Sequence, residues 1–241
     1  MPAELTPNET AHATAVKAMF SGIAGRYDLL NHVLSLNIDK RWRRKVRAEL
    51  QRILNDKTAV VLDVACGTGD LSIELQHDSA AQIVGTDFCR PMLAIARDKS
   101  AAGSFAIPYV EADAMKLSFA DDSFDALTIA FGLRNLANFE GGLVELSRVL
   151  KPGGEIAILE FSSPIVPGFR QLFNFYFANV LPRIGGAVSG SRGAYEYLPD
   201  SVRKFPDQKD LAALMEQTGF EEVEYQNLTG GIAAIHTGLK S

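Results

Sequence analysis

Residues that could do chemistry are concentrated in the stretch from 59 to 71, Ala-Val-Val-Leu-Asp-Val-Ala-Cys-Gly-Thr-Gly-Asp-Leu. The β-branched apolar run predicts a buried parallel strand, and Gly67-Thr68-Gly69 predicts a tight turn that brings bare backbone close to a ligand. Asp63 stands at the strand end, whereas Ser72 occupies the position of the third glycine in a dinucleotide fingerprint. The stretch therefore favours a nucleotide-type ligand other than a dinucleotide. A purely structural turn between strand and helix is the alternative.

Two more acidic residues follow predicted strands. Asp87 comes directly after a strand pattern at Gln82–Thr86, and Asp113 follows another at Ala106–Glu111. The carboxyl ends of parallel strands meet at one edge of a sheet, where an acid can bind both hydroxyls of a ribose. Each aspartate alone is better explained as a turn or cap residue. Together with Asp63 they predict a nucleoside-binding edge.

The spacing Asp63-X-X-X-Gly67-X-Gly69 resembles motif I of the class I S-adenosylmethionine-dependent methyltransferases. The resemblance implies an α/β fold with a Rossmann-like, seven-stranded, mostly parallel sheet and helices on both faces. In that family the glycines make room for the methionine part of the cofactor, and the acid orients the loop or the amino group of the cofactor. An acid and a small residue after the third strand contact the adenine. The implied residues that bind S-adenosylmethionine are Asp63, Gly67, Thr68, Gly69, Asp87, Asp113 and Ala114.

Two longer signatures narrow the resemblance. The segments Tyr27–Trp42 and Arg148–Ser162 resemble those of the ubiquinone/menaquinone methyltransferase family, and so does Phe-Gly-Leu-Arg-Asn at 131–135 after a fourth predicted strand. Three positions depart from the commoner pattern, where the family usually has Met, His and Ser: Leu30, Asp39 and Ala130. The last removes a hydroxyl from the surroundings of the cofactor. The resemblance spans nearly the whole chain.

The family resemblance implies C-methylation of a polyprenyl hydroquinone, from demethylmenaquinol to menaquinol, or of the corresponding benzoquinol, or of both. A ring carbon becomes a good nucleophile when a neighbouring hydroxyl, with a pKa of about 10, loses its proton, and a nearby cation lowers that pKa by about 1–3 units. We predict that Arg134 is this cation and that Asn135 and Tyr27 hold the quinol oxygens or a water. Alternatively, Arg134 pairs with Asp87 or Asp113 and only stabilises the site. Methylation of a sterol or another phenolic, or a non-catalytic methyltransferase-like scaffold, are the competing functions.

Length, composition and charge predict the domain organisation and exclude some classes of partner. The 241 residues are 47% hydrophobic, which predicts one domain over 1–241 with an N-terminal helical cap at about 13–55 and an inserted lid at about 163–206. The net charge of −5 argues against a nucleic-acid binder. Cys66 and Cys89 predict no disulfide framework and thus a cytoplasmic protein, and the four histidines lack the spacing of metal ligands. The sequence does not determine the oligomeric state, and a homodimer is one of the candidates.

Two segments predict a peripheral contact with the inner face of the plasma membrane. Six of the eight residues from 40 to 47 are basic, and five of the nine residues from 169 to 177, in the lid, are aromatic. Basic residues are attracted to anionic lipids, and an apolar lid would admit a polyprenyl chain. The alternatives are a solvated helix face and a buried helix pair. Neither a signal peptide nor a spanning helix is predicted, and residues 1–12 are expected to form a mobile tail.

The remaining pattern supplies the elements that position the site. Apolar spacing predicts two or three helices over 13–54, with Trp42 packed in the core. Further along, the sequence predicts a strand at 123–130, a helix at 139–150, a strand after Gly154, a helix at 210–218 and closing strands at 221–226 and 232–237 joined across Gly230-Gly231.

Overall fold

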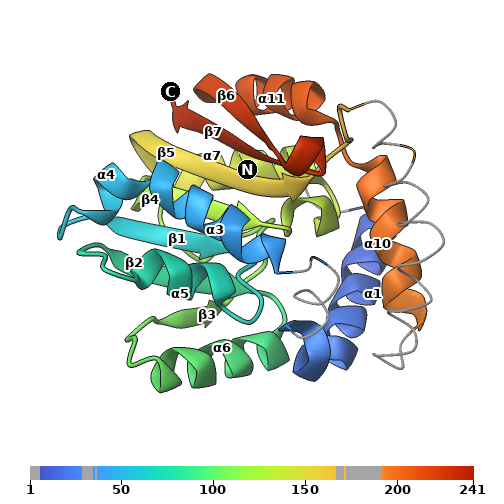
Figure 1. The fold of residues 1–241 in the computed structure, drawn as a ribbon, viewed down its shortest axis with the longest axis horizontal. Helices are drawn as coiled ribbons and strands as arrows, with labels where there is room; N and C mark the ends of the chain where they lie inside the picture. The colour runs from blue at the N-terminus through green and yellow to red at the C-terminus, as the bar shows by residue number, and fades with distance from the viewer. Residues whose placement is uncertain (1–5, 29–34, 36, 167–170, 172–191) are drawn as a thin grey trace.

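The computed structural model describes residues 6–28, 35, 37–166, 171 and 192–241 (Figure 1). The basic segment at 40–47 lies within these residues. The five aromatic residues at 169–177 of the predicted lid lie outside them, and so does part of the signature between Tyr27 and Trp42.

A seven-stranded sheet forms the centre of the described chain, in the order β3-β2-β1-β4-β5-β7-β6. The strands are β1 (Val60–Val64), β2 (Gln82–Asp87), β3 (Tyr109–Glu111), β4 (Phe124–Ala130), β5 (Leu150–Phe161), β6 (Phe220–Leu228) and β7 (Ala233–Lys240). Strands β1 to β5 are parallel, and β7 runs antiparallel between β5 and β6. The predicted mostly parallel sheet is confirmed. Its order reverses between β1 and β4, where open α/β sheets bind ligands.

Helices cover both faces of the sheet (Figure 1). On one face, a core that includes Trp42, Leu75 and Leu93 joins α3 (Ile38–Glu49), α5 (Asp70–Gln76) and α6 (Arg90–Ala102) to the strands. The short α4 (Gln51–Leu54) follows α3. On the other face, a core that includes Leu146 and Met215 joins α7 (Phe139–Val149) and α11 (Gln208–Gln217) to them. Trp42 is thus a core residue, as predicted.

The N-terminal segment corrects one prediction. Helix α1 (Pro7–Ile23) begins within the stretch that was predicted to be a mobile tail. Thr6 and Glu9 form a capping box, in which the Thr6 N–H donates to Glu9 Oε2 at 2.7 Å and the Glu9 N–H donates to Thr6 Oγ1 at 3.3 Å. Proline at the first helical position suits this start, because its missing N–H has no partner there anyway. The tail prediction is wrong from Pro7 onward.

The later elements follow the predicted order with shifted bounds. Strand β5 begins at Leu150, before the Gly153-Gly154 turn residues rather than after them, and β3 starts only at Tyr109. Within the predicted lid, α10 (Arg192–Lys204) is a helix that packs beside α1 (Figure 1). None of the helices in the described residues is both long and apolar enough to cross a membrane.

Candidate active site

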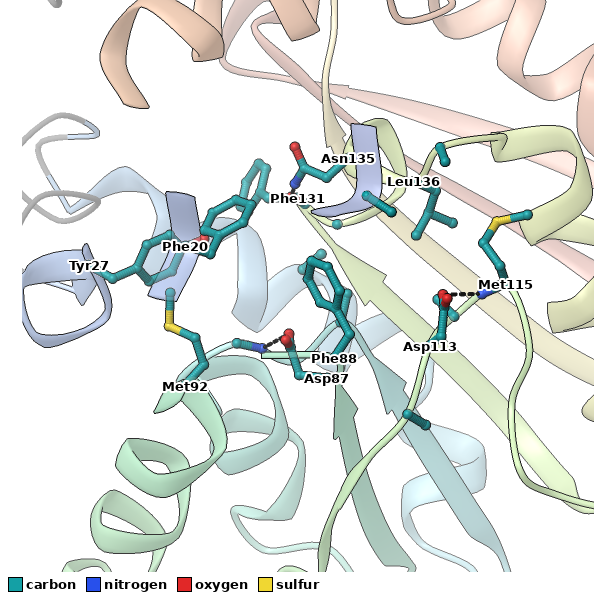
Figure 2. A pocket seen from close by; sticks show the side chains of 18 residues that line it. Phe20, Tyr27, Asp87, Phe88, Met92, Asp113, Met115, Phe131, Asn135 and Leu136 are labelled. Atoms are coloured by element: carbon teal, nitrogen blue, oxygen red, sulfur yellow. Dashed lines mark hydrogen bonds between the residues drawn. The ribbon is translucent and has the colours of Figure 1, made fainter. Parts of the chain in front are cut away.

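A cleft opens at the carboxyl ends of β1, β2 and β4, at the point where the strand order reverses. Its empty volume, open mouth included, is about 760 Å³. The wall contains six of the residues predicted from the sequence: Tyr27, Gly67, Asp87, Asp113, Ala114 and Asn135. Figure 2 shows that carboxylates from two strand ends and aromatic rings from α1 and β4 surround the same opening.

The glycine turn after β1 has a backbone conformation that residues with a side chain rarely adopt. Gly67 has φ +56° and Gly69 has φ +83°, and Ala65 between strand and turn is also left-handed at φ +50°. A Cβ on Gly69 would lie 2.6 Å from Tyr109 Oη and 3.0 Å from Ala96 Cβ. Gly67 is needed for its conformation, and Gly69 is needed for both its conformation and its close packing.

Replacement of Gly69 by alanine is expected to lower the free energy of unfolding. The left-handed backbone costs a side chain about 1–2 kcal/mol, and the contact with Tyr109 adds to that cost. The matched control is Gly153→Ala, because Gly153 has φ +71° but open space around its Cβ position. Urea unfolding should show a clearly larger loss for Gly69→Ala, and equal losses would contradict the packing argument.

Asp87 ends β2, and each of its two carboxylate oxygens accepts one backbone N–H. Its Oδ1 accepts the Cys89 N–H at 2.8 Å, and its Oδ2 accepts the Gly67 N–H at 2.9 Å. Burial raises the pKa of Asp87 to about 6, against the opposing effect of these hydrogen bonds. An ionised carboxylate offers about four acceptor positions, so about two remain for hydroxyls of a ligand in the cleft. The strand-tip role predicted for this acid fits the structure.

Asp63 lies behind the glycine turn rather than in the cleft. It is buried, accepts hydrogen bonds from Ser72 Oγ at 2.6 Å and Thr128 Oγ1 at 2.8 Å, and is not part of the cleft wall. Burial raises the pKa of Asp63 to about 6. Because Ser72 lies in the first turn of α5, the carboxylate orients the turn and the helix that follows it.

Thr68 is likewise buried behind the turn rather than exposed in the cleft. Its hydroxyl donates to Asp28, at the end of the N-terminal segment. Lys99 lies 2.7 Å from the same Asp28 carboxylate and also pairs with Asp70. Asp70 in turn lies 2.9 Å from Arg43 of α3. These ion pairs join three helices to the glycine turn and were not predicted, because their members are far apart in the sequence.

Asp113 and Ala114 lie on the cleft wall beyond β3. Asp113 Oδ1 accepts the Met115 N–H at 2.9 Å, which fixes the turn, and Ala114 is buried. The acid and the small residue that the resemblance assigns to adenine binding thus lie next to each other on this wall.

Arg134 differs from its prediction in both partner and position. It lies in the 3-10 turn η2 (Leu133–Asn135), and its Nη1 donates to Glu160 Oε1 at 2.7 Å and to the Phe131 carbonyl at 2.5 Å. The side chain is 6% exposed and is not on the cleft wall. Its partner is therefore Glu160 of β5, and neither Asp87 nor Asp113, which were the partners proposed from sequence.

Asn135 and Tyr27 do line the cleft. Asn135 Nδ2 donates to the same Phe131 carbonyl at 3.0 Å, so this one oxygen holds both Arg134 and Asn135. Tyr27 packs edge-on against Phe20 of α1, with ring centroids 5.9 Å apart.

Sequence reasoning missed the apolar wall of the cleft. Phe20, Phe88, Met92 and Met115 line it, and Phe131 does so with φ +56°, a left-handed backbone that costs a non-glycine residue about 1–3 kcal/mol. Phe131 begins the Phe-Gly-Leu-Arg-Asn segment but was not predicted to be a site residue. Phe20 lies on α1, and helical spacing alone does not distinguish a core face from a cleft wall.

The residues present fit S-adenosylmethionine. A Cβ on Gly67 would point into the space beside Tyr27, 3.9 Å from its Cε1, so bare backbone keeps that space open. Asp87 keeps acceptor positions for the ribose, and Asp113 and Ala114 lie where an adenine would be bound.

Solved structures of other proteins share this architecture. A methyltransferase from Thermotoga maritima, described as a possible histamine N-methyltransferase, has a TM-score of 0.64 and 16% identity, covering 94% of this chain and all of its own. An Aquifex aeolicus SAM-dependent methyltransferase has a TM-score of 0.59 and 17% identity over 81% of this chain and 89% of its own. The fold is that of the class I S-adenosylmethionine-dependent methyltransferases.

Sequence comparison identifies the family within this class. A model of the ubiE/COQ5 methyltransferase family matches residues 8–240. The demethylmenaquinone methyltransferases of Deinococcus radiodurans and Thermus thermophilus are 50% and 49% identical over 94% and 91% of this chain, and 92% and 99% of their own. A ubiquinone/menaquinone biosynthesis C-methyltransferase of Geobacter sp. strain M21 is 47% identical over 93% of this chain and 96% of its own. The chain belongs to the ubiE/COQ5 methyltransferase family, which confirms the resemblance found in the signatures.

Proposed function

We propose that the protein transfers the methyl group of S-adenosylmethionine to a ring carbon of a polyprenyl hydroquinone, converting demethylmenaquinol to menaquinol. The observation that carries this proposal is that strand-end carboxylates and a wall of aromatic rings line one cleft. A polar cofactor and an apolar ring can therefore meet there. The names of the two relatives with about half of their residues identical favour the naphthoquinol over the benzoquinol.

Each residue in the cofactor half of the cleft has its own proposed role. When bound, S-adenosylmethionine supplies an electrophilic methyl group on a sulfonium. Asp87 would hold the ribose, Gly67 would leave room for the methionine part, and Asp113 with Ala114 would bind the adenine. Gly69 is not on the cleft wall and would act through its close packing against Tyr109. Asp63 and Thr68 would act from behind the turn, by fixing its shape.

The acceptor half has to activate a ring carbon. The quinol hydroxyl must lose a proton, and its pKa of about 10 makes this unfavourable without stabilisation of the oxyanion. Asn135 and Tyr27, which line the cleft, would hold the quinol oxygens or a water that takes the proton. Arg134 would act from behind them, through the Phe131 carbonyl that it shares with Asn135.

Methyl transfer from radiolabelled S-adenosylmethionine to reduced demethylmenaquinol tests the proposal. We expect label in menaquinol and none in the oxidised quinone, whose ring carbon is not electron-rich. The corresponding benzoquinol, offered in parallel, separates a specific enzyme from one with dual specificity. Label only in a sterol or an unrelated phenolic would overturn the proposed acceptor. Cofactor binding without transfer to any acceptor would favour a non-catalytic scaffold.

The proposal includes a cytoplasmic protein in peripheral contact with the inner membrane face, where the prenyl substrate resides. Helix α3 supports this contact, because Lys40, Arg41, Arg44 and Lys45 are exposed. Residues three or four apart share a helix face. In contrast, Arg43 on the same helix is buried and pairs with Asp39, so the solvated-face interpretation applies to only part of the run.

The variant Arg41→Gln/Arg44→Gln is expected to bind anionic vesicles about 30-fold more weakly, because each basic residue near such a surface contributes about 1 kcal/mol. The matched control is Lys57→Gln/Lys116→Gln, which removes two exposed charges elsewhere. Co-sedimentation with anionic and neutral vesicles measures both. Equal sedimentation of the wild-type protein with the two kinds of vesicle would refute the electrostatic contact.

A further inference from the structure

The side-chain amide of Asn135 is held at both ends. Its Nδ2 donates to the Phe131 carbonyl at 3.0 Å, and its Oδ1 accepts the hydroxyl of Tyr197 at 3.2 Å. An asparagine amide has two N–H donors and two acceptor positions. The described residues use one donor and one acceptor position, which leaves one of each for a molecule in the cleft that Asn135 lines.

The two partners also decide which way the amide faces. If the amide were flipped, its oxygen would face the Phe131 carbonyl, and two acceptors would meet without a proton between them. The carbonyl therefore sets the direction of the amide, and the tyrosine hydroxyl holds the other end in place. Figure 2 shows Asn135 bonded to Phe131 at the edge of the cleft.

Tyr197 reaches this position from a distant part of the chain. It belongs to α10, in the segment that follows β5, and its ring lies 6.3 Å from that of His12 on α1. Tyr197 thus lies where α1, α10 and η2 meet. Burial raises the pKa of Tyr197, so the hydroxyl keeps its proton at neutral pH and can act as a donor.

We infer that Tyr197 is a positioning residue for the methyl-transfer reaction: its hydroxyl holds the Asn135 amide so that the unused donor and acceptor of that amide meet the acceptor molecule. The inference rests on the proposed function for its kinetic test. Helix α10 then has a second role besides packing against α1, because its position determines whether the Tyr197 hydroxyl reaches Asn135.

Tyr197→Phe tests the inference because it removes the hydroxyl and keeps the ring. We expect kcat to fall about five- to tenfold, the size of one lost hydrogen bond, with the Kd for S-adenosylmethionine unchanged within twofold. In the Asn135→Ala background the same substitution should change kcat by less than twofold, because the group that Tyr197 positions is gone. Tyr225→Phe, on β6 against His236, is the matched control and should retain full kcat.

Two results would overturn the inference: an unchanged kcat in Tyr197→Phe, or the same loss with and without Asn135. A purely structural role would lower the unfolding temperature and would not depend on Asn135. If the wild-type protein methylates no quinol, the proposed function fails, and the inference is then tested by the NMR signals of the Asn135 side-chain amide. These signals should shift in Tyr197→Phe and stay in place in Tyr225→Phe. Unshifted signals would refute it.

Discussion

Asp87→Asn is expected to weaken S-adenosylmethionine binding by about 100-fold, because hydrogen bonds to a charged group contribute about 1.5–3 kcal/mol each. The substitution keeps the shape of the side chain. It replaces one acceptor oxygen by a donor, which would face the N–H of either Gly67 or Cys89. The loss should appear in the Kd measured by calorimetry.

The matched control for this loss is Asp125→Asn. Asp125 is also a strand aspartate that accepts a backbone N–H, from Val60 at 2.9 Å, but it lies at the amino end of β4, away from the cleft. The Asp125→Asn variant should bind the cofactor with the same Kd as the wild-type protein. If both variants bind equally well, Asp87 is not a cofactor ligand.

The same carboxylate predicts a pH dependence of binding. Burial raises the pKa of Asp87 to about 6 in the free protein, so the acceptor form is lost as the pH falls below that value. Cofactor hydroxyls need the ionised form, and the affinity at pH 5 should therefore be about tenfold lower than at pH 7. The pKa of Asp63 is also raised to about 6. A flat profile in Asp87→Asn assigns the effect to Asp87, whereas a persistent slope would assign it to Asp63.

The strand-end part of the site could be predicted because local pattern determines it. An apolar strand, a glycine turn and an acid at the strand end are encoded within about a dozen residues, and parallel strands bring such ends to one edge. The capping box at Thr6 and Glu9 was just as local, and it was overlooked only because the neighbouring residues are polar.

The partners of those residues could not be predicted in the same way. Glu160 meets Arg134 because β4 and β5 are neighbours in the sheet, and Tyr197 meets Asn135 from a helix 62 residues further along the chain. Neither pairing leaves a periodic trace in the sequence. A buried acid at the end of the fifth strand was the available signal for the first pair, since such a charge needs a partner.

Loss of the Arg134 side chain is expected to have the largest effect on both stability and turnover. In Arg134→Met, Glu160 would be left buried without its counter-charge, which costs roughly 3–5 kcal/mol of unfolding free energy. Turnover should fall about 10- to 100-fold, because losing the charged hydrogen bond to the Phe131 carbonyl, about 1.5–3 kcal/mol, releases the group that holds Asn135 in the cleft. S-adenosylmethionine affinity should stay within a few-fold, because Arg134 is not on the cleft wall.

The pH dependence of that stability loss identifies its cause. Burial raises the pKa of Glu160, and Arg134 opposes this effect in the wild type. Without Arg134 the folded-state pKa of Glu160 rises further above the unfolded value, so the folded protein binds a proton over a wider pH range in which the unfolded chain does not. Stability relative to the wild type is then best at low pH and is lost as the pH rises. Urea unfolding should show a smaller deficit at pH 5 than at pH 8.

The double variant Arg134→Met/Glu160→Gln separates a structural role from a catalytic one. A neutral glutamine removes the unpaired charge while keeping an oxygen for one of the backbone N–H groups, of Arg134 and Phe161, that Glu160 accepts. We expect it to regain most of the lost unfolding free energy and to lose the pH dependence, as replacement of a buried ion pair by neutral groups is often tolerated. Turnover should stay low, because Asn135 and the Phe131 carbonyl still lack the guanidinium. If turnover returns together with stability, Arg134 has no part in the reaction beyond neutralising Glu160.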